Sequence, residues 1–378
     1  MNFKCAHYMA HPNIGDTHQI LNTSMILMLG EIYDKVIVYA PKDCCLDLEK
    51  QVCNQNACLS TQITYKFNKI YSQRQFLFWI TCGFQTLSSM CKTKRGEDVY
   101  FSTLNWLCFP LFNLWSRLSK RRMFTLCHND MEHLINPKTG RVNVHWHMIN
   151  YIFKRLSLAK SNMFIVLGDC IAENLKKVVK QDTINNIISI CHPYYNLTEL
   201  KEVSVTDKIK IGIVGTVKHN DMQNLKKINA ILSDYSKIKL YNISTTSEDI
   251  SIFENVVNLN SENKHMNRME YDSCIKEMDL LYYPYPRTSY RVSASGAVFE
   301  AIVKCKPIIA EANPYFEWLF DKFGDLGYLY HDKIDLKKCI DGIVSQQQSL
   351  LIKENLEHAK RYLDPKHLYM ELKRIIDC

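Results

Sequence analysis

Residues 279–310 read DLLYYPYPRTSYRVSASGAVFEAIVKCKPIIA. The stretch begins with a short apolar run that ends at Pro284, continues through a polar loop, and becomes helical in pattern near Ser295. A second apolar run at 307–310 follows. Strand, helix and strand in this order form the βαβ unit of a parallel sheet. The segment therefore predicts an α/β fold.

The same alternation extends in both directions along the chain. In the first half, short β-branched runs predict strands at 3–8, 35–39, 99–103, 123–127, 163–167 and 187–191. A polar linker at 203–208 then leads into a new strand that ends in Gly215, followed by strands expected at 238–243, 256–259, 279–283 and 307–310. We expect two Rossmann-like parallel-sheet domains facing across a cleft, over residues 1–200 and 201–345, with closing helices at 346–378 broken by Pro365.

Composition excludes several classes of protein. The chain has 378 residues, of which 47% are apolar, and only 12 Gly and 10 Pro, so it is neither low-complexity nor disordered. The N-terminus shows no secretory signal, and the most apolar windows, 76–90 and 101–116, are too short to span a membrane. The 15 cysteines are scattered without a Cys-x-x-Cys pair, which indicates reduced thiols, and His145-Trp-His147 supplies too few ligands for zinc. We expect an intracellular protein without a metal.

Charge is unevenly distributed between the two halves. Residues 1–200 carry 22 Lys and Arg against 14 Asp and Glu, whereas residues 201–378 carry 25 of each. Within the basic half, 111–122 combines aromatic residues with four bases and no acid. This pattern fits a helix that meets an anionic membrane surface, and equally an ordinary amphipathic helix with a solvated basic end. A net charge of +8 without a recognised motif does not indicate nucleic-acid binding.

The loop in 279–310 offers groups suited to a nucleotide. Backbone N–H groups at a helix start near Ser295 and Gly296 would attract a diphosphate, and Arg291 would add a charge-assisted hydrogen bond. The Glu300 carboxylate would accept hydrogen bonds from two adjacent ribose hydroxyls. The plain alternative is a capping serine, a packing glycine and a solvated glutamate.

This stretch resembles the donor-binding segment of family 4 glycosyltransferases of the GT-B fold, the group 1 enzymes of bacterial polysaccharide and O-antigen synthesis. The shared features are a strand, a proline-containing loop, a small-residue turn, a helix with Glu-Ala and a Lys-Pro-Ile-Ile-Ala strand. The family often has two glutamates with seven residues between them; the second matches Glu300, and the first falls at Val292. The resemblance implies that Glu300 binds the ribose, and that Arg291, Ser295 and Gly296 hold the diphosphate.

Other segments resemble the same family in order. The Gly215 loop is similar to the first loop of the family's C-terminal domain, which implies that Lys218 meets the donor phosphates. His128 ends a strand where the family places a histidine facing the sugar, and Asp130 follows as a weaker candidate.

The loop after the first strand contains Gly15 and Asp16, which the resemblance places on the acceptor side. Its Asn-x-Gly-Asp pattern also resembles polysaccharide pyruvyl transferases.

Three functions remain open from the sequence. The first is transfer of a sugar from a nucleotide-diphosphate sugar to a glycan or lipid-linked saccharide, retaining and without a metal cofactor, by a cytoplasmic protein bound peripherally to the inner face of the membrane through 111–122. The second is pyruvyl transfer from phosphoenolpyruvate. The third is an inactive GT-B homologue that acts as a binding protein, because the first glutamate is absent at Val292.

Overall fold

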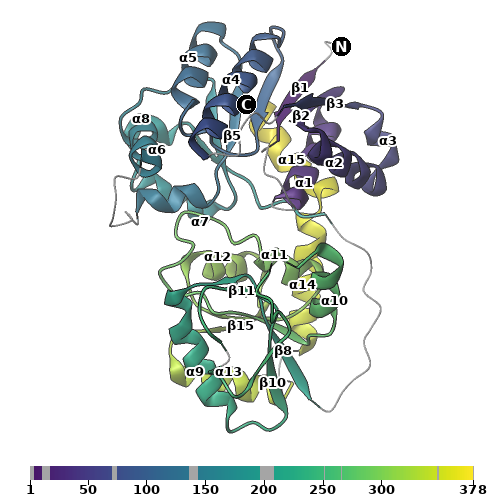
Figure 1. Ribbon diagram of the computed structural model, residues 1–378, viewed down its shortest axis with the longest axis vertical. Helices are drawn as coiled ribbons and strands as arrows, with labels where there is room; N and C mark the ends of the chain where they lie inside the picture. The colour runs from purple at the N-terminus through teal and green to yellow at the C-terminus, as the bar shows by residue number, and fades with distance from the viewer. Residues whose placement is uncertain are drawn as a thin grey trace. The chain divides into compact units, whose positions relative to one another are not determined.

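The computed structural model describes residues 4–10, 18–69, 75–135, 144–195, 208–250, 252–264, 266–346 and 349–377. The chain divides into two compact units (Figure 1). Unit 1 contains Met1–Tyr195, Val292–Ala294 and Leu363–Cys378, and unit 2 contains Asn196–Arg291 and Ser295–Tyr362. The predicted boundary near residue 200 falls within 196–207, outside the described residues.

Unit 1 is built on a parallel sheet with the strand order β3-β2-β1-β4-β5-β6-β7. Its strands are β1 (Cys5–Met9), β2 (Lys35–Pro41), β3 (Ile63–Asn68), β4 (Asp98–Phe101), β5 (Met123–Leu126), β6 (Asn162–Val166) and β7 (Ile187–Ser189). All five residues of β1 are buried, and Ala6 pairs with both Val36 and Asp98. This is the order of a Rossmann-like sheet, in which the chain reverses direction across the sheet between β1 and β4.

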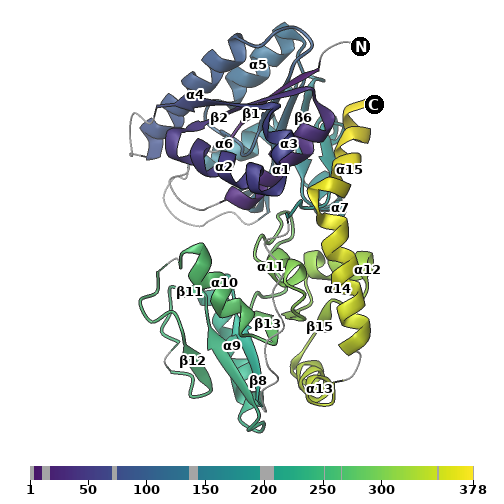
Figure 2. The ribbon, with the colours of Figure 1, turned by 90° about the vertical axis from the view of Figure 1, so that its right-hand side faces the viewer.

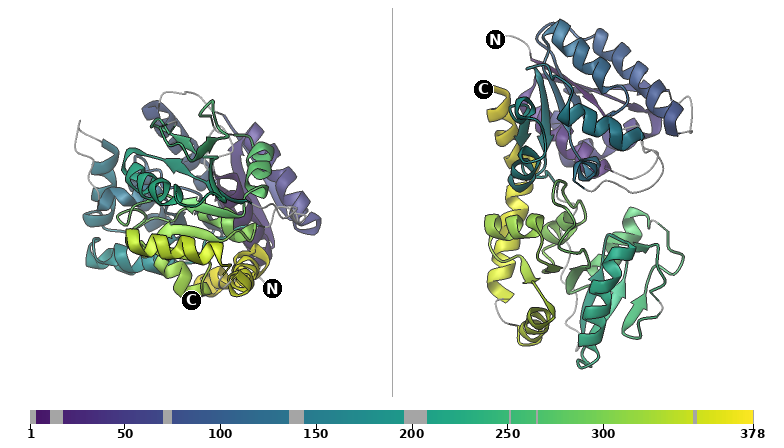
Figure 3. Two further views of the ribbon diagram at one scale, coloured as in Figure 1. Left: turned by 90° about the horizontal axis from the view of Figure 1, so that it is seen from below. Right: turned by 90° about the vertical axis from the view of Figure 1, so that its left-hand side faces the viewer.

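Helices cover both faces of this sheet, α4 and α5 on one face and α1 and α2 on the other (Figures 2 and 3). The helices of unit 1 are α1 (Gln19–Ile32), α2 (Lys42–Gln55), α3 (Ala57–Ser60), α4 (Gln75–Cys91), α5 (Phe109–Ser119), α6 (Val144–Lys154), α7 (Asp169–Lys176), α8 (Gln181–Ile184), α15 (Pro365–Asp377) and the 3₁₀ helix η1 (Asn129–Leu134). A parallel sheet covered in this way is buried on both faces, which explains its almost continuous apolar strands.

The last helix of the chain packs in unit 1, although its residues are far from the sheet in sequence. α15 lies against α1 and buries Leu368, Leu372 and Ile376, which are spaced four residues apart on one helical face. Glu371 accepts a hydrogen bond from the Cys191 backbone N–H at 3.1 Å. The predicted break at Pro365 is confirmed, because α14 ends at Leu363 and Pro365 is the first residue of α15.

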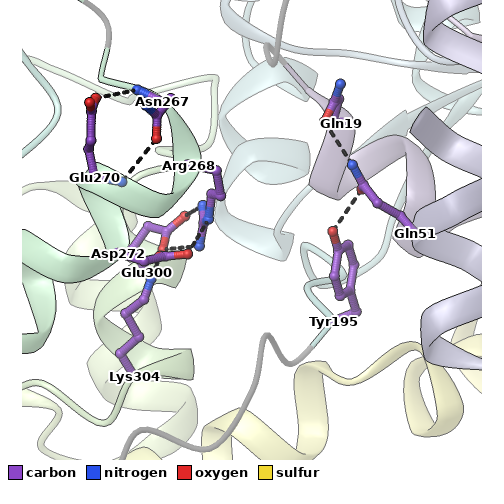
Figure 4. A network of polar contacts seen from close by, with 9 residues as sticks. All are labelled: Gln19, Gln51, Tyr195, Asn267, Arg268, Glu270, Asp272, Glu300 and Lys304. Carbon is purple, nitrogen blue, oxygen red and sulfur yellow. Dashed lines mark hydrogen bonds and ion pairs between the residues drawn. The ribbon is translucent and has the colours of Figure 1, made fainter.

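The end of the N-terminal part of unit 1 is tied to the first two helices (Figure 4). The Tyr195 hydroxyl donates to Oε1 of Gln51 at 2.8 Å, and the Gln51 amide donates to Gln19 at 2.8 Å. The Tyr195 backbone N–H donates to Ser24 Oγ at 3.1 Å. These hydrogen bonds fix the chain at the point where unit 1 gives way to unit 2.

Unit 2 repeats the same sheet order, β12-β10-β8-β13-β14-β15, with β8 and β13 at its centre. Its strands are β8 (Ile209–Ile213), β10 (Ile238–Asn242), β12 (Val256–Asn258), β13 (Leu280–Tyr283), β14 (Ile308–Glu311) and β15 (Gly327–Tyr330), with a separate small sheet of β9 (Thr216–Val217) and β11 (Thr245–Thr246). Its helices are α9 (Met222–Leu232), α10 (Arg268–Lys276), α11 (Val298–Val303), α12 (Pro314–Phe323), α13 (Lys333–Val344), α14 (Ser349–Leu363) and the 3₁₀ helix η2 (His219–Asp221). Two Rossmann-like units confirm the predicted fold class.

Candidate active site

A tight turn at Gly215 follows the central strand of unit 2. Its φ of 89° lies in the left-handed region that favours glycine. A Cβ added there would lie 2.0 Å from the hydroxyl oxygen of Tyr285, whose side chain is buried. Glycine is thus required both by the backbone conformation and by the approach of Tyr285. The turn leads from β8 into β9, which belongs to the separate small sheet.

A pocket of about 220 Å³ opens beside this turn, within unit 2. Its walls come from the ends of β8 and β10, from β9 and β11, and from the segment around the start of α10: Gly215, Thr216, Ile243, Thr245, Lys264, Met266 and Tyr271. Open α/β sheets bind ligands outside the carboxyl ends of their strands, near the point where the strand order reverses. The pocket combines apolar walls with hydroxyl groups and one ammonium group, which suits a small polar ligand with a flat apolar part.

A network of two acids and two bases is centred on Glu300 (Figure 4), and its member Arg268 lies beside Tyr271 of the pocket wall. Arg268 donates from two nitrogens to the two oxygens of Glu300, at 2.6 and 3.0 Å, and from Nε to Asp272 at 2.8 Å. Lys304 Nζ donates to Glu300 at 2.9 Å and also to Asp272. Glu300 and Lys304 are only 6% and 8% exposed. Buried charges persist when each is paired and hydrogen-bonded, as they are here.

In the structure the Glu300 carboxylate has protein partners that the sequence did not predict. The sequence predicts a carboxylate that faces ribose hydroxyls, whereas in the structure both oxygens of Glu300 accept hydrogen bonds from Arg268 and one also accepts from Lys304. Arg268 also lies beside the Tyr271 ring, with its guanidinium carbon 5.9 Å from the ring centroid. Glu300 is therefore linked to the pocket through Arg268 and Tyr271.

Sequence reasoning missed Arg268. The only local signal for it is the capping box of α10, in which the Asn267 side chain accepts from the Glu270 N–H at 3.0 Å and Glu270 accepts from the Asn267 N–H at 3.2 Å. That signal places Arg268 at a helix start but says nothing of Glu300, 32 residues later.

The predicted diphosphate-binding residues occupy different environments. Ser295 is buried, and its Oγ has no hydrogen-bond partner among the described residues, whereas Gly296 is exposed and a Cβ added there would meet open space. Arg291 and Lys218 are exposed, and Lys218 follows β9 rather than lining the pocket. The helix predicted to begin near Ser295 begins at Val298 instead.

Val292, which stands where the family has its first glutamate, is buried and belongs to unit 1. Its backbone N–H and the Ser293 hydroxyl donate to Oε1 of Glu132 in η1, at 3.0 and 2.9 Å. A carboxylate is therefore present beside Val292, but it comes from another part of the chain.

In unit 1, His128 lies in the short loop between β5 and η1, where its ring contacts Ser102 and His18. Its Nε2 lies 2.8 Å from the Ser102 carbonyl oxygen, which can only accept, so Nε2 carries the proton and Nδ1 is the acceptor. The His18 ring lies 4.8 Å away. Burial, together with His18, lowers the pKa of His128 to about 3. At neutral pH His128 is therefore an uncharged imidazole suited to accepting a hydrogen bond.

Asp130 lies in η1, with Oδ1 3.2 Å from Nε2 of His145. Gly15 and Asp16, predicted on the acceptor side, lie outside the described residues. The structure thus brings Asp130 near a histidine that the sequence did not connect with it.

His192 makes the unfolding free energy depend on pH, because burial lowers the pKa of its imidazole to about 4. Its Nδ1 donates a hydrogen bond to the Pro193 carbonyl at 3.0 Å. The unfolded chain protonates this imidazole near pH 6.5, so the contribution of His192 to folding stability falls as pH drops from about 6.5 toward 4, by at most roughly 1.4 kcal/mol per pH unit. His128, whose pKa is lowered to about 3, adds a separate contribution in the same range. We expect His192→Gln to flatten the dependence of the unfolding free energy on pH in this range, as measured by urea denaturation. His367→Gln, which removes an exposed histidine of unit 1, should leave that slope unchanged; equal slopes for all three proteins would contradict the prediction.

The helices α4 and α5 lie side by side in unit 1 (Figures 2 and 3), and both carry exposed apolar side chains. The exposed set comprises Phe76, Leu77, Phe84, Leu111, Leu114 and Leu118, with Leu118 76% exposed. Of the four bases in 111–122, Arg122 donates twice to Asp98, at 2.9 and 2.6 Å. Arg117 donates to the Ser157 carbonyl at 2.7 Å, and Arg121 donates to the Lys94 carbonyl at 3.0 Å. Within the described residues, no helix has the length and apolar character needed to cross a bilayer.

Neither a protein-family model nor a curated protein sequence matches the chain. Solved structures do match over its whole length. The apo form of the lipopolysaccharide outer core galactosyltransferase WaaB is 14% identical, with a TM-score of 0.56 over 99% of both chains. WaaG, a glycosyltransferase involved in lipopolysaccharide biosynthesis, is 12% identical, with a TM-score of 0.56 over 99% of both chains.

A glycosyltransferase from Rickettsia africae ESF-5 is 12% identical, with a TM-score of 0.58 over 98% of this chain and 97% of that one. At such low identity the similarity concerns the fold. Together with two Rossmann-like sheets of the same strand order, these matches show that the chain has the GT-B fold that its sequence predicts.

Proposed function

We propose that the protein is a glycosyltransferase that moves a sugar from a nucleotide-diphosphate sugar to a glycan or lipid-linked saccharide in the synthesis of cell-surface polysaccharide. The observation that carries the proposal is the pocket beside Gly215, which lies in the unit expected to bind the donor and at the carboxyl edge of its sheet. The GT-B fold, shared with two enzymes of lipopolysaccharide synthesis, supports the same class of reaction.

In this proposal the nucleoside occupies the pocket lined by Thr216, Thr245 and Tyr271. Glu300 acts on the ribose side by holding Arg268 against Tyr271. Lys218, Arg291 and the backbone at Ser295 and Gly296 meet the diphosphate, and their charges stabilise the leaving group without a divalent cation. The sequence contains no Asp-x-Asp motif that would hold such a cation.

In unit 1, His128 would accept a hydrogen bond from a sugar hydroxyl through Nδ1 and so position the substrate, with Asp130 nearby. Gly15 and Asp16 are proposed on the acceptor side. Retention of the anomeric configuration follows from the family resemblance. Product anomer analysis by NMR, together with rates measured with and without added Mg²⁺ or Mn²⁺, tests both expectations.

The donor assignment is tested by thermal unfolding of the full chain in the presence of UDP, GDP, dTDP, CMP or phosphoenolpyruvate. A ligand that binds only the folded state, at about 100 times its Kd, stabilises it by roughly 2.7 kcal/mol. We expect a rise in Tm with one nucleoside diphosphate. A rise with phosphoenolpyruvate alone would indicate pyruvyl transfer instead, and no rise with any nucleotide would overturn the donor pocket.

The exposed surface of α4 and α5 is proposed to bind the cytoplasmic face of an anionic membrane, where a lipid-linked acceptor is held. Apolar side chains would enter the headgroup region while Arg117, Lys120 and Arg121 meet lipid phosphates. We expect Leu114→Glu/Leu118→Glu to lower binding to vesicles of anionic phospholipid more than about tenfold in cosedimentation, because two leucines lose burial worth roughly 1.5–3 kcal/mol each.

Leu350→Glu is the matched control, since Leu350 is an equally exposed leucine of α14 in unit 2. It should bind vesicles as the wild type does. Vesicle binding that Leu114→Glu/Leu118→Glu leaves unchanged, or binding to neutral vesicles as strong as to anionic ones, would contradict the assigned surface.

A further inference from the structure

Three metal-ligand side chains converge in unit 1. Asp130 and His133 lie in η1, where three residues make one turn, so residues three apart share a face. His145 lies in the first turn of α6. The donor atoms of the three side chains all lie within 4.8 Å of one another. The geometry thus joins a 3₁₀ helix and an α-helix through one carboxylate and two imidazoles.

The position of the His145 ring is set by its neighbours. Trp106 stacks on it, with ring centroids 4.7 Å apart and an interplanar angle of 21°, and the His133 ring meets it edge-on at 5.1 Å. Nε2 of His145 is buried and lies 3.2 Å from Oδ1 of Asp130. The atom therefore lies close to the carboxylate and to the second imidazole of the cluster.

We propose that Asp130, His133 and His145 bind Zn²⁺, with a fourth position open to water or another oxygen ligand. Two imidazoles and a carboxylate suit zinc, whereas Ca²⁺ and Mg²⁺ prefer oxygen ligands alone. Tetrahedral zinc, with bonds of about 2.0–2.2 Å, places its donors roughly 3.3 Å apart, so the distances between donor atoms must shorten by at most about 1.5 Å. All three side chains are partly exposed, which allows that movement and leaves the fourth position accessible.

A second cluster, Cys5, His7 and Glu97, is a weaker candidate. His7 already has both ring nitrogens engaged, Nδ1 with the Tyr39 hydroxyl at 3.1 Å and Nε2 with Glu97 at 2.9 Å. Burial and the nearby Glu97 raise the pKa of the Cys5 thiol to about 11, which opposes the thiolate that zinc binds. Hydrogen bonds alone account for this arrangement.

The zinc would act as a positioning ion rather than as a partner of the donor diphosphate. It would clamp η1 to α6 and so fix the start of η1, which directly follows His128. This role does not depend on which sugar is transferred, and it stands independently of the proposed function.

The test measures binding of Zn²⁺ and Co²⁺ to the full chain after removal of metal by a chelator, with folding checked by circular dichroism. His147 is the matched control, because it is two residues from His145 on the same helix and therefore on a different face. We expect the wild type and His147→Ala to bind one ion with similar affinity, and His133→Ala and His145→Ala to bind at least about tenfold more weakly. Similar affinities in all four proteins would overturn the site.

Substitution by cysteine gives a readout that does not require loss of binding. His145→Cys would place a thiolate on the metal, so the Co²⁺ form should gain a sulfur-to-metal charge-transfer band that the wild type and His147→Cys lack. Absence of that band from a folded His145→Cys, or its presence in His147→Cys as well, would show that His145 is not a ligand.

Discussion

Glu300→Ala should lower the unfolding free energy by about 3–5 kcal/mol, because it leaves Lys304 buried with half of its counter-charge removed. Arg268 would also lose both hydrogen bonds to Glu300, while its hydrogen bond to Asp272 would remain. Urea denaturation of the full chain measures this loss. An Ala variant as stable as the wild type would contradict the buried network.

A second variant separates stability from donor binding. Replacing both partners of the buried pair, as Glu300→Leu/Lys304→Met, removes the unpaired charge and should recover much of the stability. If Glu300 serves the donor through Arg268 and Tyr271, the double variant should still show a raised KM for the nucleotide sugar. A stable double variant with the wild-type KM would show that Glu300 is a structural residue only.

Gly215→Ala is the second substitution with a large expected effect. The new Cβ would clash with the Tyr285 hydroxyl, and the alanine would have to adopt a left-handed φ. We therefore expect the unfolding free energy to fall by roughly 2–4 kcal/mol and nucleotide binding to weaken. Gly215→Ala/Tyr285→Phe removes the closest clashing atom and should recover part of the stability. No recovery would mean that backbone strain, not Tyr285, sets the cost.

Gly296→Ala is the matched glycine control within the predicted diphosphate segment. A Cβ there meets open space, so its stability should stay within about 0.5 kcal/mol of the wild type. If the diphosphate approaches this backbone closely, Gly296→Ala will still weaken nucleoside diphosphate binding in the thermal assay. Unchanged binding would remove Gly296 from the proposed donor site.

Much of the fold was predictable because its signals are local. Apolar β-branched runs such as 209–213 and 163–166 encode buried parallel strands directly, and Pro365 begins a helix because its fixed φ suits that position. β3 was missed because it is an edge strand whose residues are only partly buried, so the sequence ITYKFN lacks a clear apolar run. β15 was missed because its four residues, GYLY, are too few to show a pattern.

The candidate sites depend on pairings that no local pattern specifies. The sequence alone suggests that Glu300 binds a ribose. In the folded chain Arg268 of α10 donates to the carboxylate of Glu300 in α11, a pairing that no local pattern predicts. His145 reads as half of an incomplete pair with His147 until η1 brings Asp130 and His133 to it. The sequence by itself determined two α/β units and the position of their loops, because strand and helix patterns depend on near neighbours. The tertiary structure decided which charged and metal-binding side chains meet, because that depends on which strands and helices lie adjacent after folding.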